Sequence, residues 1–148
     1  ESALTDHPQA VVRAKILVNM GVTQYCSGDQ QAALHSLTAA LTIQRKWLEG
    51  PVRRESLVYD AATTLQNMGK LYLGRGDAPD LARLVYEEAL LLLKTVFPKH
   101  HPAVLSSYEN LAVCHAQSAC LREGKLKAIK CVAKSVAARQ SCGQVAYS

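Results

Sequence analysis

Three copies of one short segment constrain the fold of this chain more than any other feature of its sequence. The segment LVNMG at residues 17–21 recurs as LQNMG at 65–69 and as YENLA at 108–112. The shared residues Asn19, Asn67 and Asn110 lie 48 and 43 residues apart. A self-similar unit of that length with helical periodicity is typical of stacked helical repeats. The sequence therefore predicts an all-α superhelix, or solenoid, of about three helical hairpins.

The composition fits a single helical domain. Of the 148 residues, 49% are hydrophobic but 5% are aromatic, a balance that suits close-packed helices better than sheets. The most apolar run, residues 89–93, is far shorter than the roughly 20 residues that span a bilayer. The first residues lack the pattern of a signal peptide. Because the sequence does not begin with Met, we expect a fragment of a longer protein.

The cysteines and histidines show no spacing that is typical of a catalytic or metal-binding site. The five cysteines have no C-x-x-C spacing, which argues against a disulfide framework and a zinc site. We expect reduced thiols, as in a cytoplasmic protein. The histidines do not pair with nucleophiles at a catalytic spacing, and no Gly-rich phosphate loop is present. The sequence predicts no enzyme, no cofactor and no metal.

The net charge of +5 comes entirely from the end of the chain. From residue 121 onward there are six basic residues and one acid, whereas the first 120 residues hold eleven of each sign. A basic helix can attract nucleic acid, an acidic membrane or a microtubule. The alternative is a solvated outer face on a terminal repeat. The scarcity of aromatic residues disfavours nucleic acid.

Turn residues divide the chain into hairpins at 8–48, 52–97 and 102–139, followed by a tail at 140–148 that we expect to be frayed. Asp6 is the predicted N-cap of the first helix. Gly28 and Asp29 form the first turn, and a Gly-rich segment at 74–77 forms the second. The third turn lies near Ala119 or near Gly124. With the turn at Gly124, the buried stripe of the last helix would be Leu126, Ile129, Val132, Ala133 and Val136.

Small residues recur where the two helices of each hairpin would face one another. The expected pairs are Gly21 with Ala33, Gly69 with Ala82, and Ala112 with Gly124. Large hydrophobic residues, Leu37 and Tyr86, would fill the space beside them. This pattern resembles the tetratricopeptide repeat, or TPR. The stretch 86–112 is further similar to the longer repeat of kinesin light chains, which has Ala-Leu, Lys-Val-Leu, His-Pro and Asn-Leu-Ala in this register.

The resemblance implies that the first helix of each hairpin lines a concave groove that binds a peptide or helical segment. It also implies that Asn19, Asn67 and Asn110 hold the backbone of that peptide, because a carboxamide both donates and accepts hydrogen bonds. The alternative is that these amides bond only to neighbouring helices or water. Helical geometry selects the residues that we call the groove surface: Lys15, Val18, Asn19, Val22, Tyr25, Thr63, Gln66, Asn67, Lys70, Leu73, Ser106, Glu109, Asn110, Val113 and Gln117.

Two function classes are consistent with these patterns. The first is a non-enzymatic scaffold or adaptor in the cytoplasm, with a possible link to a motor or the cytoskeleton. Its partner would be another protein, and unpaired cations at Lys15 and Lys70 would favour an acidic segment. The second is a structural module that self-associates or docks on the cytoskeleton through helix faces. In the run from Leu90 to Leu93, we expect Leu91 or Leu92 to face outward.

Overall fold

The computed structural model describes residues 7–50, 54–76, 78–117 and 121–146, with the backbone alone for 7, 121–125 and 142–146. These ranges contain six helices and no strand. The helices are α2 (His7–Cys26), α3 (Gln30–Leu48), α4 (Glu55–Arg75), α5 (Pro79–Lys94), α6 (Pro102–Gln117) and α7 (Leu121–Ala146). None of these helices is long and apolar enough to cross a bilayer.

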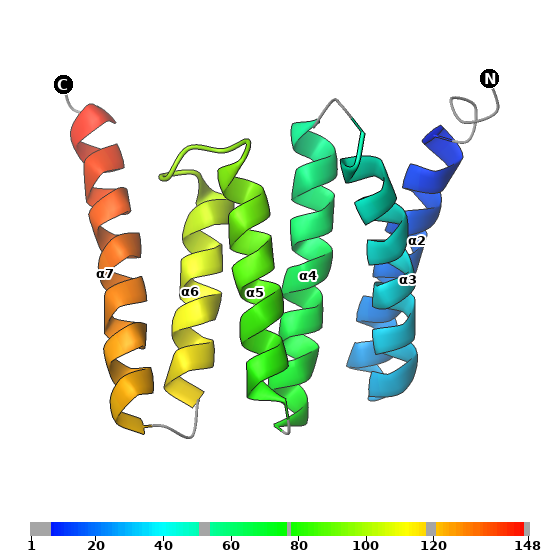
Figure 1. Ribbon diagram of the computed structural model, residues 1–148, viewed down its shortest axis with the longest axis horizontal. Coiled ribbons are helices and arrows are strands. Elements are labelled where there is room, and N and C mark those ends of the chain that lie inside the picture. The colour runs from blue at the N-terminus through cyan, green and yellow to red at the C-terminus, as the bar shows by residue number, and fades with distance from the viewer. Residues whose placement is uncertain (1–6, 51–53, 77, 118–120, 147–148) are drawn as a thin grey trace.

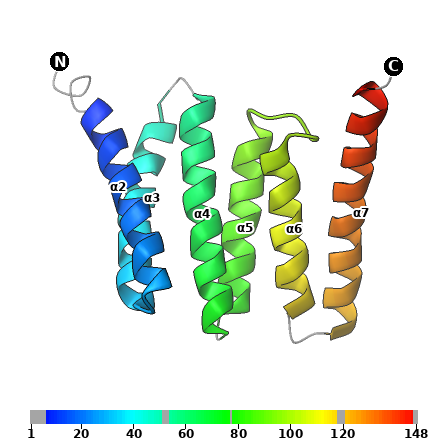
Figure 2. The same ribbon diagram turned by 180° about the vertical axis from the view of Figure 1, so that it is seen from behind.

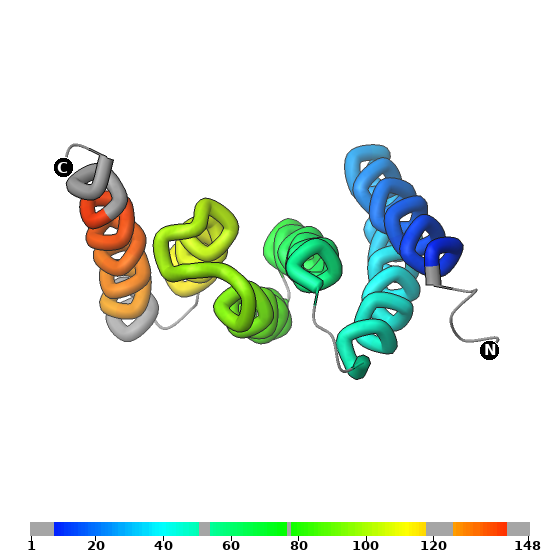
Figure 3. The backbone as a smooth tube through the Cα atoms, turned by 90° about the horizontal axis from the view of Figure 1, so that it is seen from above, coloured from blue at the N-terminus to red at the C-terminus, as the bar shows by residue number. Residues whose placement is uncertain are grey.

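The helices stand side by side in chain order, as in a solenoid (Figure 1). The most extensive contacts join α2 to α3, α4 to α5 and α6 to α7, which are the three hairpins. The contacts of α3 with α4 and of α5 with α6 join one hairpin to the next. Seen from above, α2, α4 and α6 form one layer, and α3 and α5 form another (Figure 3). The predicted all-α solenoid is confirmed.

Two glycines allow the paired helices of the first two hairpins to approach closely. A Cβ atom at Gly21 would lie 2.8 Å from Cγ of Leu37 and 3.2 Å from the carbonyl oxygen of Ala33. A Cβ atom at Gly69 would lie 2.5 Å from the Tyr86 ring. Leu37 and Tyr86 are each 1% exposed, and burial raises the pKa of the Tyr86 hydroxyl above its usual range. A side chain at either glycine would therefore push the hairpin open.

The contact at Gly69 is made by the side chain that was expected to fill the space beside it. The three atoms nearest to a Cβ at Gly69 all belong to the Tyr86 ring. Ala82, the predicted small partner, is fully buried. In the third hairpin, Ala112 is buried, whereas the surroundings of Gly124 lie outside the described side chains.

Individual turn and capping residues mark the starts and ends of several helices, as the sequence predicts. Gly28 and Gly76 adopt positive φ angles of 87° and 73°, a conformation that glycine reaches without strain. The Asp29 carboxylate accepts a hydrogen bond from the backbone N–H of Ala32 at 3.0 Å, which caps α3. Pro79 and Pro102 begin α5 and α6. The predicted cap at Asp6 lies outside the described residues.

In the third hairpin, α7 extends beyond its predicted C-terminal boundary, and one of the two predicted turn positions is excluded. The predicted turn near Ala119 falls on residues outside the described ranges. Because α6 ends at Gln117 and α7 begins at Leu121, the alternative turn at Gly124 is wrong. The stripe that this alternative would bury is exposed, with Ile129 at 65%. The helix also continues to Ala146, beyond the boundary at 139, so the expected fraying from Ser141 is not observed up to that residue.

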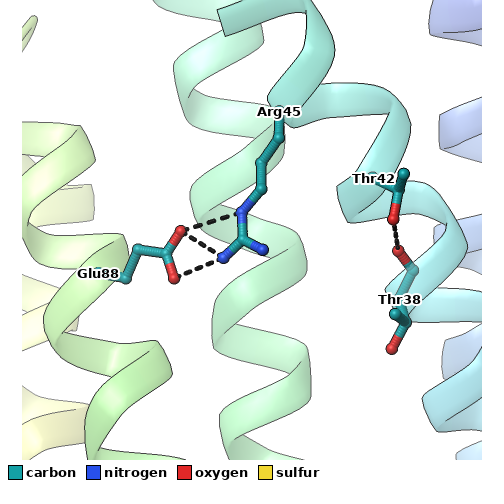
Figure 4. Close-up of polar contacts among 4 residues, drawn as sticks. All are labelled: Thr38, Thr42, Arg45 and Glu88. Carbon is teal, nitrogen blue, oxygen red and sulfur yellow. Dashed lines mark hydrogen bonds and ion pairs between the residues drawn. The ribbon is translucent and has the colours of Figure 1, made fainter.

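An ion pair joins the second helices of neighbouring hairpins (Figure 4). The Arg45 guanidinium of α3 donates to the Glu88 carboxylate of α5 from Nε at 3.2 Å and from Nη2 at 2.7 and 2.8 Å. The two side chains are 54% and 39% exposed, so solvent screens the pair. Such a pair contributes about 0.2–1 kcal/mol, and it orients the hairpins more than it stabilises them.

The packing of Gly69 predicts the cost of a single methyl group. We expect Gly69→Ala to lower the free energy of unfolding by about 1–2 kcal/mol, because overpacking exceeds the gain in helix propensity. The measurement is urea denaturation followed by circular dichroism. The control is Gly50→Ala, because among the described residues a Cβ at Gly50 would meet only the Trp47 carbonyl oxygen, at 3.4 Å. Equal stabilities of the two variants would contradict the close approach.

The burial of Cys114 against α5 predicts its chemical reactivity. Its Sγ atom lies 3.4 Å from the Pro79 carbonyl oxygen, and burial raises the pKa of its thiol. Cys26 is exposed. Since the thiolate is the reactive form, we expect iodoacetamide to alkylate Cys26 in the folded protein and Cys114 only on unfolding. Peptide mass spectrometry distinguishes the sites. Rapid alkylation of Cys114 without unfolding would show that α6 is rotated away from α5.

Candidate functional site

The groove surface lies on the layer formed by α2, α4 and α6, which faces the viewer in Figure 2. α4 contacts both α2 and α6 directly, so the three helices form one continuous layer. None of the groove-surface residues is buried. Their side chains are therefore open to solvent at least in part, which a binding surface requires.

The three repeated asparagines retain hydrogen-bonding capacity. Asn19 is exposed, and Asn67 and Asn110 are half-buried. Within the described part of the chain, none of their carboxamides bonds to another residue. The hydroxyl of Thr23 donates to the backbone carbonyl oxygen of Asn19 at 2.9 Å, and this bond does not involve the Asn19 carboxamide. Each amide can thus offer two donors and an acceptor to a ligand.

A cavity of about 230 Å³ lies between α4 and α6, with α5 behind it. Three of its lining residues belong to the predicted groove surface: Thr63, Gln66 and Ser106. The others are Tyr59, Ala62, Leu93, Pro102 and Ala103. Sequence analysis missed Tyr59, although it lies one turn before Thr63 on the same face of α4. The mixture of hydroxyl, amide, aliphatic and aromatic groups suits one amino-acid side chain of a ligand.

A hydrogen-bond relay joins the two helices that flank this cavity. The amide of Gln66 donates to the hydroxyl of Ser107 at 2.9 Å, and that hydroxyl donates to the Ala103 carbonyl oxygen at 2.9 Å. Ser107 is fully buried. Gln66 therefore joins α4 to α6, and its amide nitrogen already donates a hydrogen bond within the protein.

Aromatic rings lie at the end of α4 where the loop between α5 and α6 passes. Tyr59 meets Phe97 edge to face at 6.3 Å between centroids, and Phe97 stacks on His101 at 4.1 Å. Nδ1 of His101 accepts the backbone N–H of Ala103 at 3.2 Å, so it caps α6. These contacts keep Tyr59 beside the cavity, because its neighbour Phe97 packs on His101 and His101 is bonded to the start of α6.

The structure separates the groove surface into distinct parts. Asn19 borders an open hollow on α2 with Ile16, Met20, Thr23 and Gln24. Asn67 and Asn110 line neither this hollow nor the cavity between α4 and α6. The cavity is formed by the three groove residues Thr63, Gln66 and Ser106 with five that the prediction did not include. Of the three repeated asparagines, Asn19 lines one of these two hollows and the other two line neither.

The charges of the layer differ from the prediction. Nζ of Lys15 lies 3.7 Å from Oδ2 of Asp60, so it is not an unpaired cation. This acid lies a full helical hairpin later in the sequence, and only folding brings it near Lys15. Lys70 is exposed and makes no ion pair with a described residue. Glu109 pairs with Arg139 of α7.

Among the described residues, no group of three or more His, Cys, Asp or Glu side chains could hold a metal ion. Comparison of the sequence with family models and with curated proteins found no match. The row of paired helices and the open layer of α2, α4 and α6 define the class of protein as one built from stacked helical hairpins.

The relay through Gln66 predicts a difference between two adjacent positions. We expect Gln66→Leu to lower the free energy of unfolding by about 0.5–1.5 kcal/mol, because the bond to Ser107 is lost. The matched control, Asn67→Leu, removes no bond to a described residue and should change stability less. Urea denaturation measures both. A larger loss for Asn67→Leu would show that the neighbouring amide, not Gln66, joins the helices.

Proposed function

We propose that this chain is a non-enzymatic scaffold of the tetratricopeptide type that binds an extended peptide or a helical segment of another protein across α2, α4 and α6. The observation that carries the proposal is the cavity between α4 and α6, lined by Thr63, Gln66 and Ser106. One helical turn further along α4 and α6 are Asn67 and Asn110, whose half-buried carboxamides make no hydrogen bond to described residues. A side chain of the ligand would enter the cavity while Asn67 and Asn110 bond to its backbone.

The repeat resemblance supports a finer proposal. The segment 86–112 has the kinesin-light-chain-like order of motifs, and we propose that the chain acts in the cytoplasm as an adaptor, with a link to motors or the cytoskeleton. With Lys15 paired to Asp60, Lys70 is the groove-surface cation that would favour an acidic residue in the ligand. A single exposed cation contributes little affinity, so shape and backbone bonding dominate recognition.

Self-association is the second candidate, and one observation favours it. Both outer helices expose apolar side chains, with Val12, Ile16 and Met20 on α2 at 46–56%. A scaffold that assembled through these faces would leave the groove surface empty. Its mass in solution would rise with concentration.

Peptide display against the chain tests the leading proposal. We expect Ser106→Phe, which fills the cavity, to weaken a recovered peptide by at least about tenfold. The matched control is Thr42→Phe, at an exposed position on α3 in the other layer. Combined Asn67→Ala and Asn110→Ala should also weaken binding. Unchanged affinity for Ser106→Phe, or no recovered peptide with a mass that rises in light scattering, would contradict the proposal.

A further inference from the structure

The last helix, α7, has one face that is anchored and one that is not. Ser135 and Ala138 are 2% and 8% exposed, and Cys131 is half-buried, at the i, i+4, i+7 spacing of a face packed on α6. Nζ of Lys134 lies 5.7 Å from the centroid of the Tyr108 ring. Arg139 pairs with Glu109. These contacts fix the rotation of α7 and therefore the direction of its other face.

That other face is a continuous apolar stripe. Leu126, Ile129, Val132 and Val136 are 56%, 65%, 49% and 44% exposed. Ile129, Val132 and Val136 line a shallow hollow of about 510 Å³ whose other walls include Ala133 and Ala137. Apolar residues at this spacing normally face a core. Small residues among large ones let a second helix approach closely, so the hollow fits a helix better than an extended strand.

The charge around the stripe selects the kind of helix. Among the described side chains of α7, residues 126–141, there are four basic residues and no acid, and two of the four, Lys134 and Arg139, contact α6. Lys130 is exposed and lies one turn from Leu126 and Ala133 on the edge of the stripe. A helix seated on the stripe would place its flanking residues beside this positive edge. Acidic flanks are therefore complementary, and basic flanks are repelled.

The same charges argue against a second copy of this chain. An α7 face docked on another α7 would bring two basic edges together. The exposed apolar stripe of α2 is also an unfavourable partner for the α7 stripe, because the exposed Arg13 lies beside it. Like charges opposed across an interface disfavour both arrangements.

We infer that the outer face of α7, from Leu126 to Val136, is a docking site for an amphipathic helix with acidic flanks. The apolar side of that helix would fill the hollow, and its carboxylates would lie beside Lys130. The site is on the outside of the last hairpin and is separate from the groove surface.

Two synthetic helical peptides test this inference with the whole chain. Both carry the same Leu stripe at i, i+3, i+4 and i+7, one with Glu and the other with Lys at the flanking positions. Fluorescence anisotropy should show the Glu peptide binding at least about tenfold more tightly at low salt. Higher salt should narrow that difference, because screening acts on exposed charges. Equal affinities for the two peptides would overturn the inference.

Substitutions locate the bound peptide. Val132→Asp should weaken the Glu peptide by at least about tenfold. The matched control is Leu91→Asp, because Leu91 is 66% exposed on α5 and outside the stripe. Lys130→Glu should reverse the preference between the peptides. Circular dichroism confirms that each variant is folded. Loss of binding in Ser106→Phe with no change in Val132→Asp would place the peptide in the groove and overturn the inference, as would a dimer that Val132→Asp dissolves.

Discussion

The contact between a glycine on one helix and a large hydrophobic residue on its partner sets the geometry of the first two hairpins. Gly21 lies under Leu37, and Gly69 lies under the ring of Tyr86, at distances that leave no room for a methyl group. In each of these hairpins, a large side chain packs on a glycine of the partner helix, and this contact recurs with the repeat. Because each hairpin closes in this way, the remaining apolar faces are left to join one hairpin to the next.

This arrangement explains why the molecule offers surfaces in place of an enclosed site. Helices inside the row have neighbours on two sides and α7 contacts only α6 among the described helices, so the remaining sides meet solvent. On the layer of α2, α4 and α6, an amide and hydroxyls lie among apolar groups around a small cavity. On α7, the exposed positions are apolar with a basic edge. The two surfaces differ in chemistry, and we propose that they bind different segments of partner proteins.

The sequence predicted the elements whose signals are local. Gly28, Asp29, Pro79 and Pro102 act within a few residues of their own positions, so the turns and helix starts they mark were found. The repeated small residues located the hairpin contacts. Long-range consequences were not accessible. The pairing of Lys15 with Asp60 joins α2 to α4, and the cavity beside Tyr59 needs three helices. The rotation of α7, which exposes its apolar stripe, depends on contacts with α6 that no local pattern specifies.

The most direct test of the solenoid measures whether the hairpins extend in a row. Val22, Lys70 and Val113 occupy equivalent positions in the three repeats and are all exposed on α2, α4 and α6. Nitroxide-bearing amino acids placed there in pairs report distances by double electron–electron resonance without touching the native cysteines. A row of hairpins predicts that the 22–113 distance is longer than both the 22–70 and the 70–113 distances. A 22–113 distance no longer than the other two would show a closed bundle, in which neither the groove surface nor the outer stripe of α7 would exist.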